Sequence, residues 1–509
     1  MASLESNNKR IAKNTILLYL RMLLTIVVGL YTSRVVLNTL GVSDYGVYNV
    51  VGGIVAMLSF LNSALTAASQ RFISFELGRG DKDKLKTIFC TSVTIHAILA
   101  LIIFIIAETV GLWFVNTHLN IEPARMTAAN WVYQCSILTF MLTIVSVPYN
   151  SCIVAHEHMN AFAYVSILEV ILKLLIVYLL LVINYDKLIT YGILVLCVAF
   201  IIRLIYGLYC KKHFEECTYH LTFDKTLFKE MFSFAGWSVV GNLGFSFKDQ
   251  VANIILNIFF GTVVNAARGV ALQVNGIIAG FSTNFMMALS PQITKQYASN
   301  NVHDSIKLVY LGCRFSFFLL LLIVTPVIVN INIILKLWLV IVPQYTSEFL
   351  CIALIAALIN SMSMPLVTAL QATGKIKLFQ TVICIIMLFE LPLSYLILYF
   401  GGKPYMAMYP TILVTLIGVF ARFIILKRIV FEYNIIYFTL LVLKNLLLAS
   451  VSIILSILVH KIFFNENLLS LFLSIIISFL IAFIIIYSFG INKNEKKFLK
   501  FKIAKIIRL

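Results

Sequence analysis

The chain has 509 residues, of which 61% are hydrophobic and only 12% are charged. Soluble globular domains have roughly half apolar and a quarter charged residues, so this composition excludes an ordinary soluble enzyme or binding module. The formal net charge of +18 does not indicate nucleic-acid binding, because the basic residues gather at the edges of apolar runs and no zinc-finger, helix-turn-helix or RNA-recognition pattern accompanies them.

Apolar runs of about 20 residues recur along the whole chain and predict an all-α polytopic membrane protein with about fourteen transmembrane helices. The first run contains Arg21 and Arg34, lacks a small-residue cleavage pattern and is too long for a signal peptide, so we expect it to be a span. The expected spans are 13–37, 44–67, 88–115, 127–150, 162–184, 189–210, 231–259, 264–292, 307–331, 347–369, 378–400, 407–427, 438–460 and 468–489.

Basic residues divide unevenly between alternate loops. One side holds most of them, including the N-terminal segment 1–12, the loop at 79–86, the segment 211–230 and the tail 490–509, whereas the other side holds only Arg125, Lys187, Lys336, Lys403 and Lys461. Since Lys and Arg concentrate in cytoplasmic loops, both termini are expected in the cytoplasm. The amphipathic basic tail is expected to lie on the anionic inner leaflet, in contact with membrane lipids.

The two halves of the chain resemble each other. Gly41 to Glu76 matches Gly261 to Gln296 in its order of spans and turns, and the segments that begin at Pro148 and Pro365 align without a gap, with Ala, Phe and Tyr at equivalent positions. We therefore predict an N-lobe at 13–210, a cytoplasmic linker at 211–230 and a C-lobe at 231–428, each of six spans. The lobes form a parallel pseudo-two-fold repeat with the site at their interface. Two further spans at 438–489 follow.

Charged residues inside the apolar runs are the candidate functional residues. A charge at the centre of a span costs roughly 2.5–3.5 kcal/mol or more, so such residues usually face a bundle interior or a wet cavity. The basic ones at several depths predict a cationic cavity for an anionic cargo, with snorkelling to headgroups as the alternative. They are Lys248, Arg268, Arg34, Arg21 and Arg314.

Acidic residues in the spans suggest a second role. Lys248 and Asp249 are adjacent and point about 100° apart on a helix, so at least one of them needs another partner. Glu390 has no basic residue near it in the sequence, and we take Asp249 and Glu390 as candidates for coupling to a proton or a sodium ion. Glu169 and Lys173 have i,i+4 spacing and are interpreted as a structural ion pair.

Neither a nucleotide, a metal nor a cofactor is indicated. The chain has no GxxxxGK[ST] loop, so we do not expect ATP hydrolysis to drive transport directly. The energy source would then be an ion gradient, the membrane potential or the substrate's own gradient. The tripeptide from His156 to His158 has no second ligand cluster nearby in the sequence. The nine cysteines form no CxxC pair and are interpreted as small buried apolar residues.

Stretches in both halves of the chain carry a specific resemblance. The sequences LGVSDYGVYNVVGGIVAML and SQRFISFELGRGD in the first half, with FFGTVVNAARGVALQVNGIIAGFSTNFMMALSPQITKQYA in the second, resemble the Wzx-type O-antigen and capsule polysaccharide flippases. These are polysaccharide-biosynthesis proteins of the multidrug/oligosaccharidyl-lipid/polysaccharide exporter superfamily. The resemblance covers about 10–430.

The resemblance implies a V-shaped fold like that of the MATE multidrug exporters and a location in the bacterial inner membrane. The implied cargo is an undecaprenyl-pyrophosphate-linked oligosaccharide, moved to the outer leaflet by alternating access, with a polysaccharide polymerase and a chain-length regulator as candidate partners. The acidic position of the family's seventh span falls on Asp249, and Arg34, Lys248 and Arg268 take the basic cavity positions.

Other functions stay open at this point. A cation-coupled multidrug exporter on the same fold would favour acidic and aromatic residues in the cavity. A membrane-embedded polysaccharide polymerase would need a large outer loop with catalytic residues, and the outer loops here are short, so we expect no enzyme. A non-transporting scaffold is the remaining alternative.

Overall fold

The computed structural model describes most of the chain between residues 2 and 496. Gaps in the description fall at 57, 118–120, 184, 221–223, 261, 340–341, 464–467 and 493–494. The side chain of Arg34, a predicted cavity residue, and the basic tail beyond Lys496 lie outside the described part.

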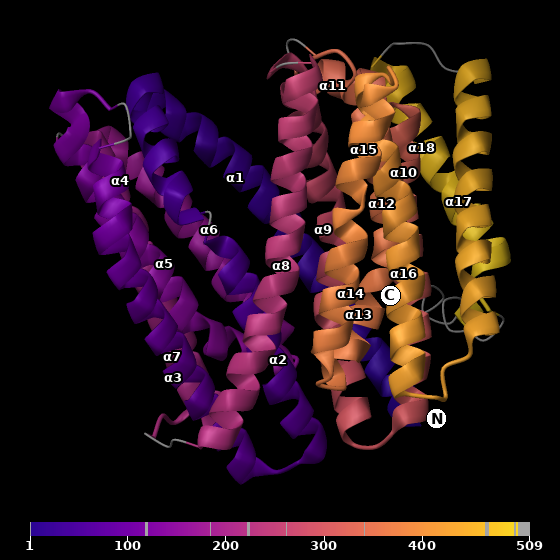
Figure 1. Ribbon diagram of the computed structural model, residues 1–509, viewed down its shortest axis with the longest axis horizontal. Coiled ribbons are helices and arrows are strands. Elements are labelled where there is room, and N and C mark those ends of the chain that lie inside the picture. The colour runs from indigo at the N-terminus through magenta and orange to yellow at the C-terminus, as the bar shows by residue number, and fades with distance from the viewer. Residues whose placement is uncertain are drawn as a thin grey trace, which may run out of the picture. The chain divides into compact units, whose positions relative to one another are not determined.

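Helices make up nearly all of the described residues, and no strand occurs among them (Figure 1). Within that part, ten helices are long and apolar enough to cross a membrane, from Lys82–Thr117 to Leu469–Gly490. The all-α polytopic prediction is confirmed, because long apolar segments can satisfy every backbone hydrogen bond internally only as helices.

The chain divides into two compact units. The first contains residues 1–243 and 287–302, and the second contains residues 244–286 and 303–509. The division falls inside two long helices, α8 (Lys225–Phe260) and α9 (Thr262–Ala298). The lobes predicted at 13–210 and 231–428 stay a prediction.

In the first unit, α5 (Met126–Ala155) is the central helix and packs against α1 (Ala2–Ala56), α2 (Ser59–Arg79), α3 (Lys82–Ile106) and α7 (Lys187–His213) (Figure 1). Its fully buried Tyr133, Ile137 and Ile144 form part of the core. The helix α6 (Met159–Val182) lies against α1 and α7, and the short α4 (Leu112–Thr117) follows a π-helical turn at Ala107–Gly111. Gly41 bends α1 with φ of 79°, a conformation that glycine adopts without steric cost.

In the second unit, α16 (Tyr409–Ile429) packs against four helices: α12 (Thr346–Ser361), α13 (Ser363–Ala372), α14 (Ile376–Leu388) and α15 (Glu390–Tyr399). The other helices that lie wholly or almost wholly in this unit are α10 (Val302–Val329), α11 (Ile331–Trp338), α17 (Ile435–Phe463) and α18 (Leu468–Ile485). Phe423 of α16 stacks on Phe438 of α17 with ring centroids 4.0 Å apart.

Prolines explain two helix breaks that divide predicted spans. The helix α12 ends at Ser361 and α14 ends at Leu388, in each case four residues before a proline, Pro365 or Pro392. Proline lacks an N–H and its ring clashes with the carbonyl four residues earlier, so the helix is interrupted there. The second break makes Glu390 the first residue of α15.

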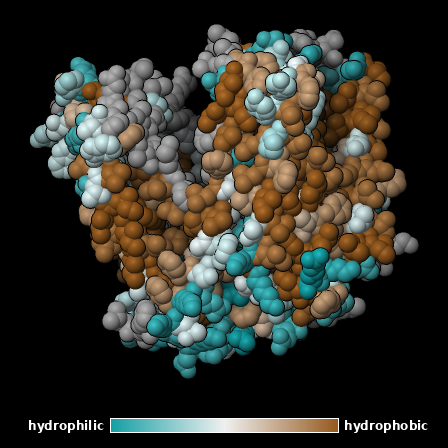
Figure 2. Space-filling view, viewed as in Figure 1, coloured by the Kyte–Doolittle hydropathy of each residue, from teal (hydrophilic) through white to brown (hydrophobic). Residues whose placement is uncertain are grey.

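Apolar side chains cover the middle of each unit on the face that Figure 2 shows, and hydrophilic side chains gather toward the lower ends. Large apolar residues are exposed along the helices of both units, including Leu181, Ile258 and Leu447. Exposed apolar surface of this extent suits contact with lipid rather than water.

Candidate functional site

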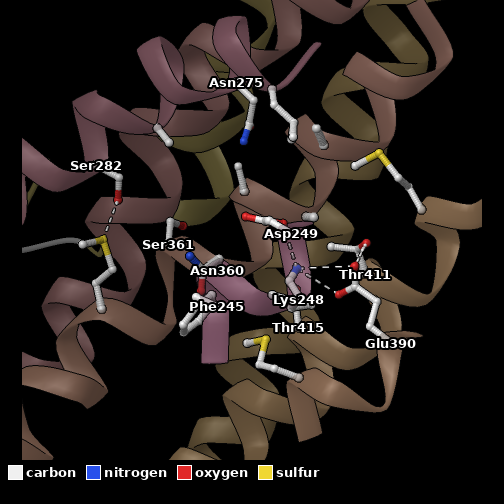
Figure 3. A pocket seen from close by; sticks show the side chains of 18 of the residues that line it. Phe245, Lys248, Asp249, Asn275, Ser282, Asn360, Ser361, Glu390, Thr411 and Thr415 are labelled. Atoms are coloured by element: carbon white, nitrogen blue, oxygen red, sulfur yellow. Dashed lines mark hydrogen bonds and ion pairs between the residues drawn. The ribbon is translucent and has the colours of Figure 1, made fainter. Parts of the chain in front are cut away.

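A cavity of about 270 Å³ lies within the second unit (Figure 3). Side chains from α8, α9, α12, α15 and α16 contribute its polar lining. They include Lys248, Asp249, Arg268, Asn275, Asn360, Glu390, Thr411 and Thr415. The chain therefore brings together four of the charged residues that were singled out inside apolar runs.

Lys248 and Glu390 form a buried ion pair at this cavity. The Lys248 ammonium donates hydrogen bonds to Glu390 Oε2 at 3.1 Å and to Oε1 at 3.3 Å, and the Thr411 hydroxyl donates to Oε1 at 2.8 Å (Figure 3). Lys248 is 7% exposed and Glu390 is 4% exposed. The sequence indicated no local basic partner for Glu390, and its partner indeed comes from another helix, 142 residues away in the sequence.

Asp249 lies between the two cavity cations. Its Oδ1 is 3.6 Å from the Lys248 ammonium and 3.4 Å from Nη2 of Arg268, and about half of its side chain is exposed. Arg268 is almost fully buried and donates a second hydrogen bond from Nη1 to the Asn253 side-chain oxygen. Its Nε has no hydrogen-bond partner among the described groups.

The charges that line the cavity balance. Two cations, Lys248 and Arg268, face two carboxylates, Asp249 and Glu390, whereas the sequence led us to expect an excess of positive charge. Buried ions need close counter-charges because desolvation costs several kcal/mol for each ion. An anion that enters here must therefore compete with the carboxylates for the two cations.

Two other predicted cavity residues that the structure describes, Arg314 and Arg21, are not among those that line this cavity. Arg314 binds the Gly490 carbonyl at 2.7 Å and the Glu495 carboxylate at 3.0 and 3.1 Å, so the cavity role expected for it is replaced by attachment of the segment after α18. Arg21, in the first unit, lies over the Phe162 ring at 4.8 Å. Glu169 and Lys173 form the ion pair that their spacing indicates, at 2.6 Å.

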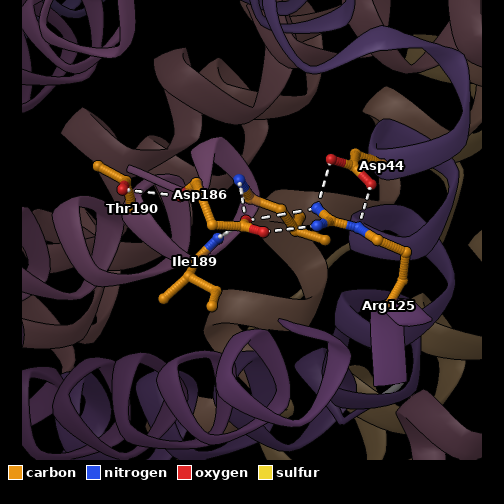
Figure 4. Close-up of polar contacts among 6 residues, drawn as sticks. Asp44, Arg125, Asp186, Ile189 and Thr190 are labelled. Atoms are coloured by element: carbon orange, nitrogen blue, oxygen red, sulfur yellow. Dashed lines mark hydrogen bonds and ion pairs between the residues drawn. The ribbon is translucent and has the colours of Figure 1, made fainter. Parts of the chain in front are cut away.

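Two charged clusters in the first unit were not found by sequence reasoning. In one, Arg125 from the 3-10 turn Pro123–Arg125 forms ion pairs with both Asp44 and Asp186 (Figure 4). Asp186 also accepts the amide hydrogens of Leu188 and Ile189 at 3.0 and 3.1 Å and so caps α7. Burial would raise the pKa of Asp186, but the bonds from Arg125 and the amides outweigh it and lower that pKa.

The other cluster surrounds Glu157, in the turn between α5 and α6. Its buried carboxylate accepts hydrogen bonds from the Lys295 ammonium at 2.9 Å and from the Gln292 side chain, while its own carbonyl accepts from Asn14 at 3.4 Å. Glu157 has φ of 62°, which is unusual for a residue with a side chain. This cluster joins the turn to α9 and α1.

The surroundings of His156 also differ from the expectation. Its Nε2 is hydrogen-bonded to Glu216, which lies beside Cys152 and Cys217. The statement that no second group of ligands accompanies His156 is therefore corrected: the other groups come from α5 and from the segment after α7.

Comparisons with known proteins agree with this fold. A family described as "Polysaccharide biosynthesis protein" matches residues 11–297, and a family described as "MatE" matches residues 238–396. An "Uncharacterized membrane protein EpsK" of Bacillus subtilis (strain 168) is 18% identical over 283 residues, which is 55% of each chain. The present chain thus matches about half the length of that relative.

Solved transporter structures resemble the chain over most of its length. An outward-facing multidrug resistance MATE family transporter of the MOP superfamily has a TM-score of 0.70 at 14% identity, covering 83% of this chain and 95% of that one. A point mutant of the Vibrio cholerae MATE transporter VcmN has a TM-score of 0.70 at 17% identity, covering 85% and 99%. At these identities the likeness shows the fold, and it confirms the predicted MATE-like architecture.

A third structure belongs to a MOP superfamily transporter from Pyrococcus furiosus. It has a TM-score of 0.67 at 14% identity, covering 82% of this chain and 95% of that one. That transporter is described as having a binding pocket of reverse polarity, which suggests a different function for it.

Proposed function

Because the chain belongs to the polysaccharide biosynthesis protein family and has the fold of the MOP-superfamily membrane transporters, we propose that it is a lipid-linked oligosaccharide flippase. Its cargo is an undecaprenyl-pyrophosphate-linked repeat unit of an O-antigen or capsule. Alternating access moves that cargo from the inner to the outer leaflet of the bacterial cytoplasmic membrane, with both termini on the cytoplasmic side.

The observation that carries this proposal is the paired arrangement of Lys248 and Glu390 at a cavity. A pyrophosphate offers several charged oxygens and can replace the Glu390 carboxylate as the partner of Lys248. Protonation of Glu390 would release the ammonium for this exchange, so that proton uptake and anion binding become linked.

Arg268 and Asp249 supply a second exchange of the same kind. Arg268 Nη2 lies 3.4 Å from Asp249, which is longer than a close charge-assisted hydrogen bond, and its Nε has no partner among the described groups. An entering phosphate oxygen can therefore bind Arg268 without breaking a strong contact. Asp249 is half exposed and is the residue best placed to take a proton or a sodium ion.

The size of the cavity limits what it holds. Drug-sized ligands occupy pockets of about 300–1,000 Å³, and this cavity of about 270 Å³ is slightly smaller. It suits a pyrophosphate with the first part of a sugar, while the polyprenyl tail stays in lipid.

A polymerase and a chain-length regulator that use the exported unit are the expected partners.

Complementation of a strain that lacks its own flippase tests the proposal. Lys248→Gln and Arg268→Gln should each abolish or strongly reduce surface polysaccharide at normal expression, since each removes a cation that the pyrophosphate needs. Lys444→Gln is the matched control, because Lys444 is exposed on α17 and does not line the cavity. Full activity of both cavity variants would contradict the anion-binding role.

A second candidate function is cation-coupled export of cationic drugs, favoured by the two carboxylates, Asp249 and Glu390, at the cavity. In inverted membrane vesicles, a proton or sodium gradient would then drive uptake of a cationic dye, and Asp249→Asn would stop it. Dye transport without any rescue of polysaccharide would favour this function over the flippase.

A further inference from the structure

Three cysteines meet where α5 and α7 end in the first unit. Cys152 lies in the last turn of α5, Cys210 lies in the last turn of α7, and Cys217 ends the 3-10 turn Glu215–Cys217 that follows. The Cys152 and Cys217 sulfurs lie within 4.8 Å of each other, and the Cys210 thiol, which donates a hydrogen bond to the Tyr149 carbonyl at 3.5 Å, lies near enough to interact with Cys217. The fold thus brings three sulfur atoms together from segments that are separated in the sequence.

A carboxylate completes the cluster. The ligand atoms of Cys152, Glu216 and Cys217 all lie within 4.8 Å of one another, and all three residues are buried. Cys152 and Cys210 have no exposed surface, and Glu216 is 7% exposed. His156 is hydrogen-bonded to one oxygen of this carboxylate, and a metal ion held by the thiols would stabilise the buried negative charge further.

We propose that Cys152, Cys210, Cys217 and Glu216 bind a Zn²⁺ ion. Tetrahedral zinc takes thiolate ligands at about 2.3 Å, which places their sulfurs about 3.8 Å apart. The ligand atoms of Cys152, Glu216 and Cys217 already lie within 4.8 Å of one another and need only small side-chain adjustments to reach this spacing, whereas the Cys210 thiol must turn from the Tyr149 carbonyl to join them. Four protein ligands leave no open position, so the site is structural.

His156 orients the carboxylate. Its Nε2 is hydrogen-bonded to Oε1 of Glu216, which leaves the other oxygen for the metal, and its ring stacks on Phe214 at 4.2 Å between centroids. A histidine held in this way fixes the direction of a ligand without contacting the ion.

The surroundings suit a negatively charged complex. Three thiolates and one carboxylate around Zn²⁺ leave a net negative charge, and Arg203 and Lys82 act electrostatically on Cys210 and Glu216. On the other side, the Cys90 sulfur accepts the His220 amide hydrogen at 3.4 Å and so holds the segment after Cys217 against α3. The ion would fasten this segment to the ends of α5 and α7.

The test uses the full-length protein, purified without a histidine tag and kept reduced with a phosphine. Zinc measured by mass spectrometry after dialysis should be close to one ion per chain, and titration of the zinc-free protein with Co²⁺ should give a thiolate-to-cobalt absorption band. Cys217→Ser and Cys152→Ser should lose both signals. Cys351→Ser is the matched control, because this thiol lies in α12 outside the cluster, and it should keep both.

The variant Cys217→His shows whether a lost metal signal is due to a missing ligand or to misfolding. Histidine can still bind a metal, so this variant should bind Co²⁺ and give a weaker thiolate-to-cobalt band. Absence of zinc and of the cobalt band from the wild-type protein would overturn the proposal. Unchanged zinc content in both serine variants would overturn it too, and so would a disulfide among these three cysteines in protein freshly isolated from cells.

Discussion

The Lys248 ammonium lies 3.1 Å from Glu390 Oε2, although 142 residues separate the two in the sequence. Removing one partner of a buried ion pair leaves an uncompensated charge, which costs about 3–5 kcal/mol. We expect Lys248→Met and Glu390→Gln each to lower the thermal stability of the detergent-solubilised protein. The double variant should recover much of the loss. Additive losses in this double-mutant cycle would show that the pair is not coupled.

Glu157 allows a sharp test of backbone strain. At φ of 62°, alanine is strained whereas glycine is not, and both substitutions remove the bonds to Lys295 and Gln292. Glu157→Gly should therefore be more stable than Glu157→Ala by about 1 kcal/mol, and both should be less stable than the wild-type protein. Thermal unfolding of the two variants measures the difference, and an alanine variant as stable as the glycine variant would contradict it.

The cluster around Asp186 predicts a dependence of stability on acid. Its pKa is lowered by Arg125 and by two amide hydrogens, against the effect of burial. A lowered pKa adds stability above the unfolded-state pKa of about 3.9, and that stability is lost as the pH falls through the lower folded-state value. Asp186→Asn should be less stable at neutral pH, and its stability should fall less steeply on acidification below about pH 4.

Acid-induced unfolding followed by circular dichroism checks this behaviour. Asp304→Asn serves as a control, because the ion pair of Asp304 with Lys307 is a partly exposed i,i+3 pair within one helix. Equal acid profiles for Asp186→Asn and the wild-type protein would exclude the proposed contribution.

Substitution of Arg314 tests whether this residue attaches the C-terminal segment or binds the cargo. Because it binds Glu495 and the Gly490 carbonyl, Arg314→Gln should retain most of the polysaccharide complementation that Arg268→Gln loses. The segment near Glu495 should become more sensitive to proteases, and Glu495→Gln should have the same effect. A transport defect in Arg314→Gln as severe as that of Arg268→Gln would restore the cavity role.

The fold followed from the sequence because apolar runs of membrane length can only become helices. Charges within those runs also identified four residues of the cavity, since burial of a charge demands a reason. Their partners could not be predicted: Lys248 and Glu390 lie on helices far apart in the sequence, and no local spacing links them. The same holds for Arg125, whose partners Asp44 and Asp186 lie 81 and 61 residues away.

Proline positions predict helix breaks only in part. Pro365 and Pro392 each follow a helix end by four residues and mark both breaks, whereas Pro148, Pro291 and Pro326 lie inside unbroken helices, so a proline alone does not locate a break. The cluster of Cys152, Cys210 and Cys217 could not be located from the sequence, because cysteines without a close-spaced pair reveal their proximity only in three dimensions.

Glu390 occupies the junction where one helix stops and the next starts. Its negative charge both holds Lys248 on α8 and faces the positive end of the α15 dipole. A single proton delivered to this carboxylate would loosen its hold on two helices together. Protonation of one carboxylate would thereby allow helix movement. The movement would occur where Pro392 cannot donate the backbone hydrogen bond that would otherwise resist bending.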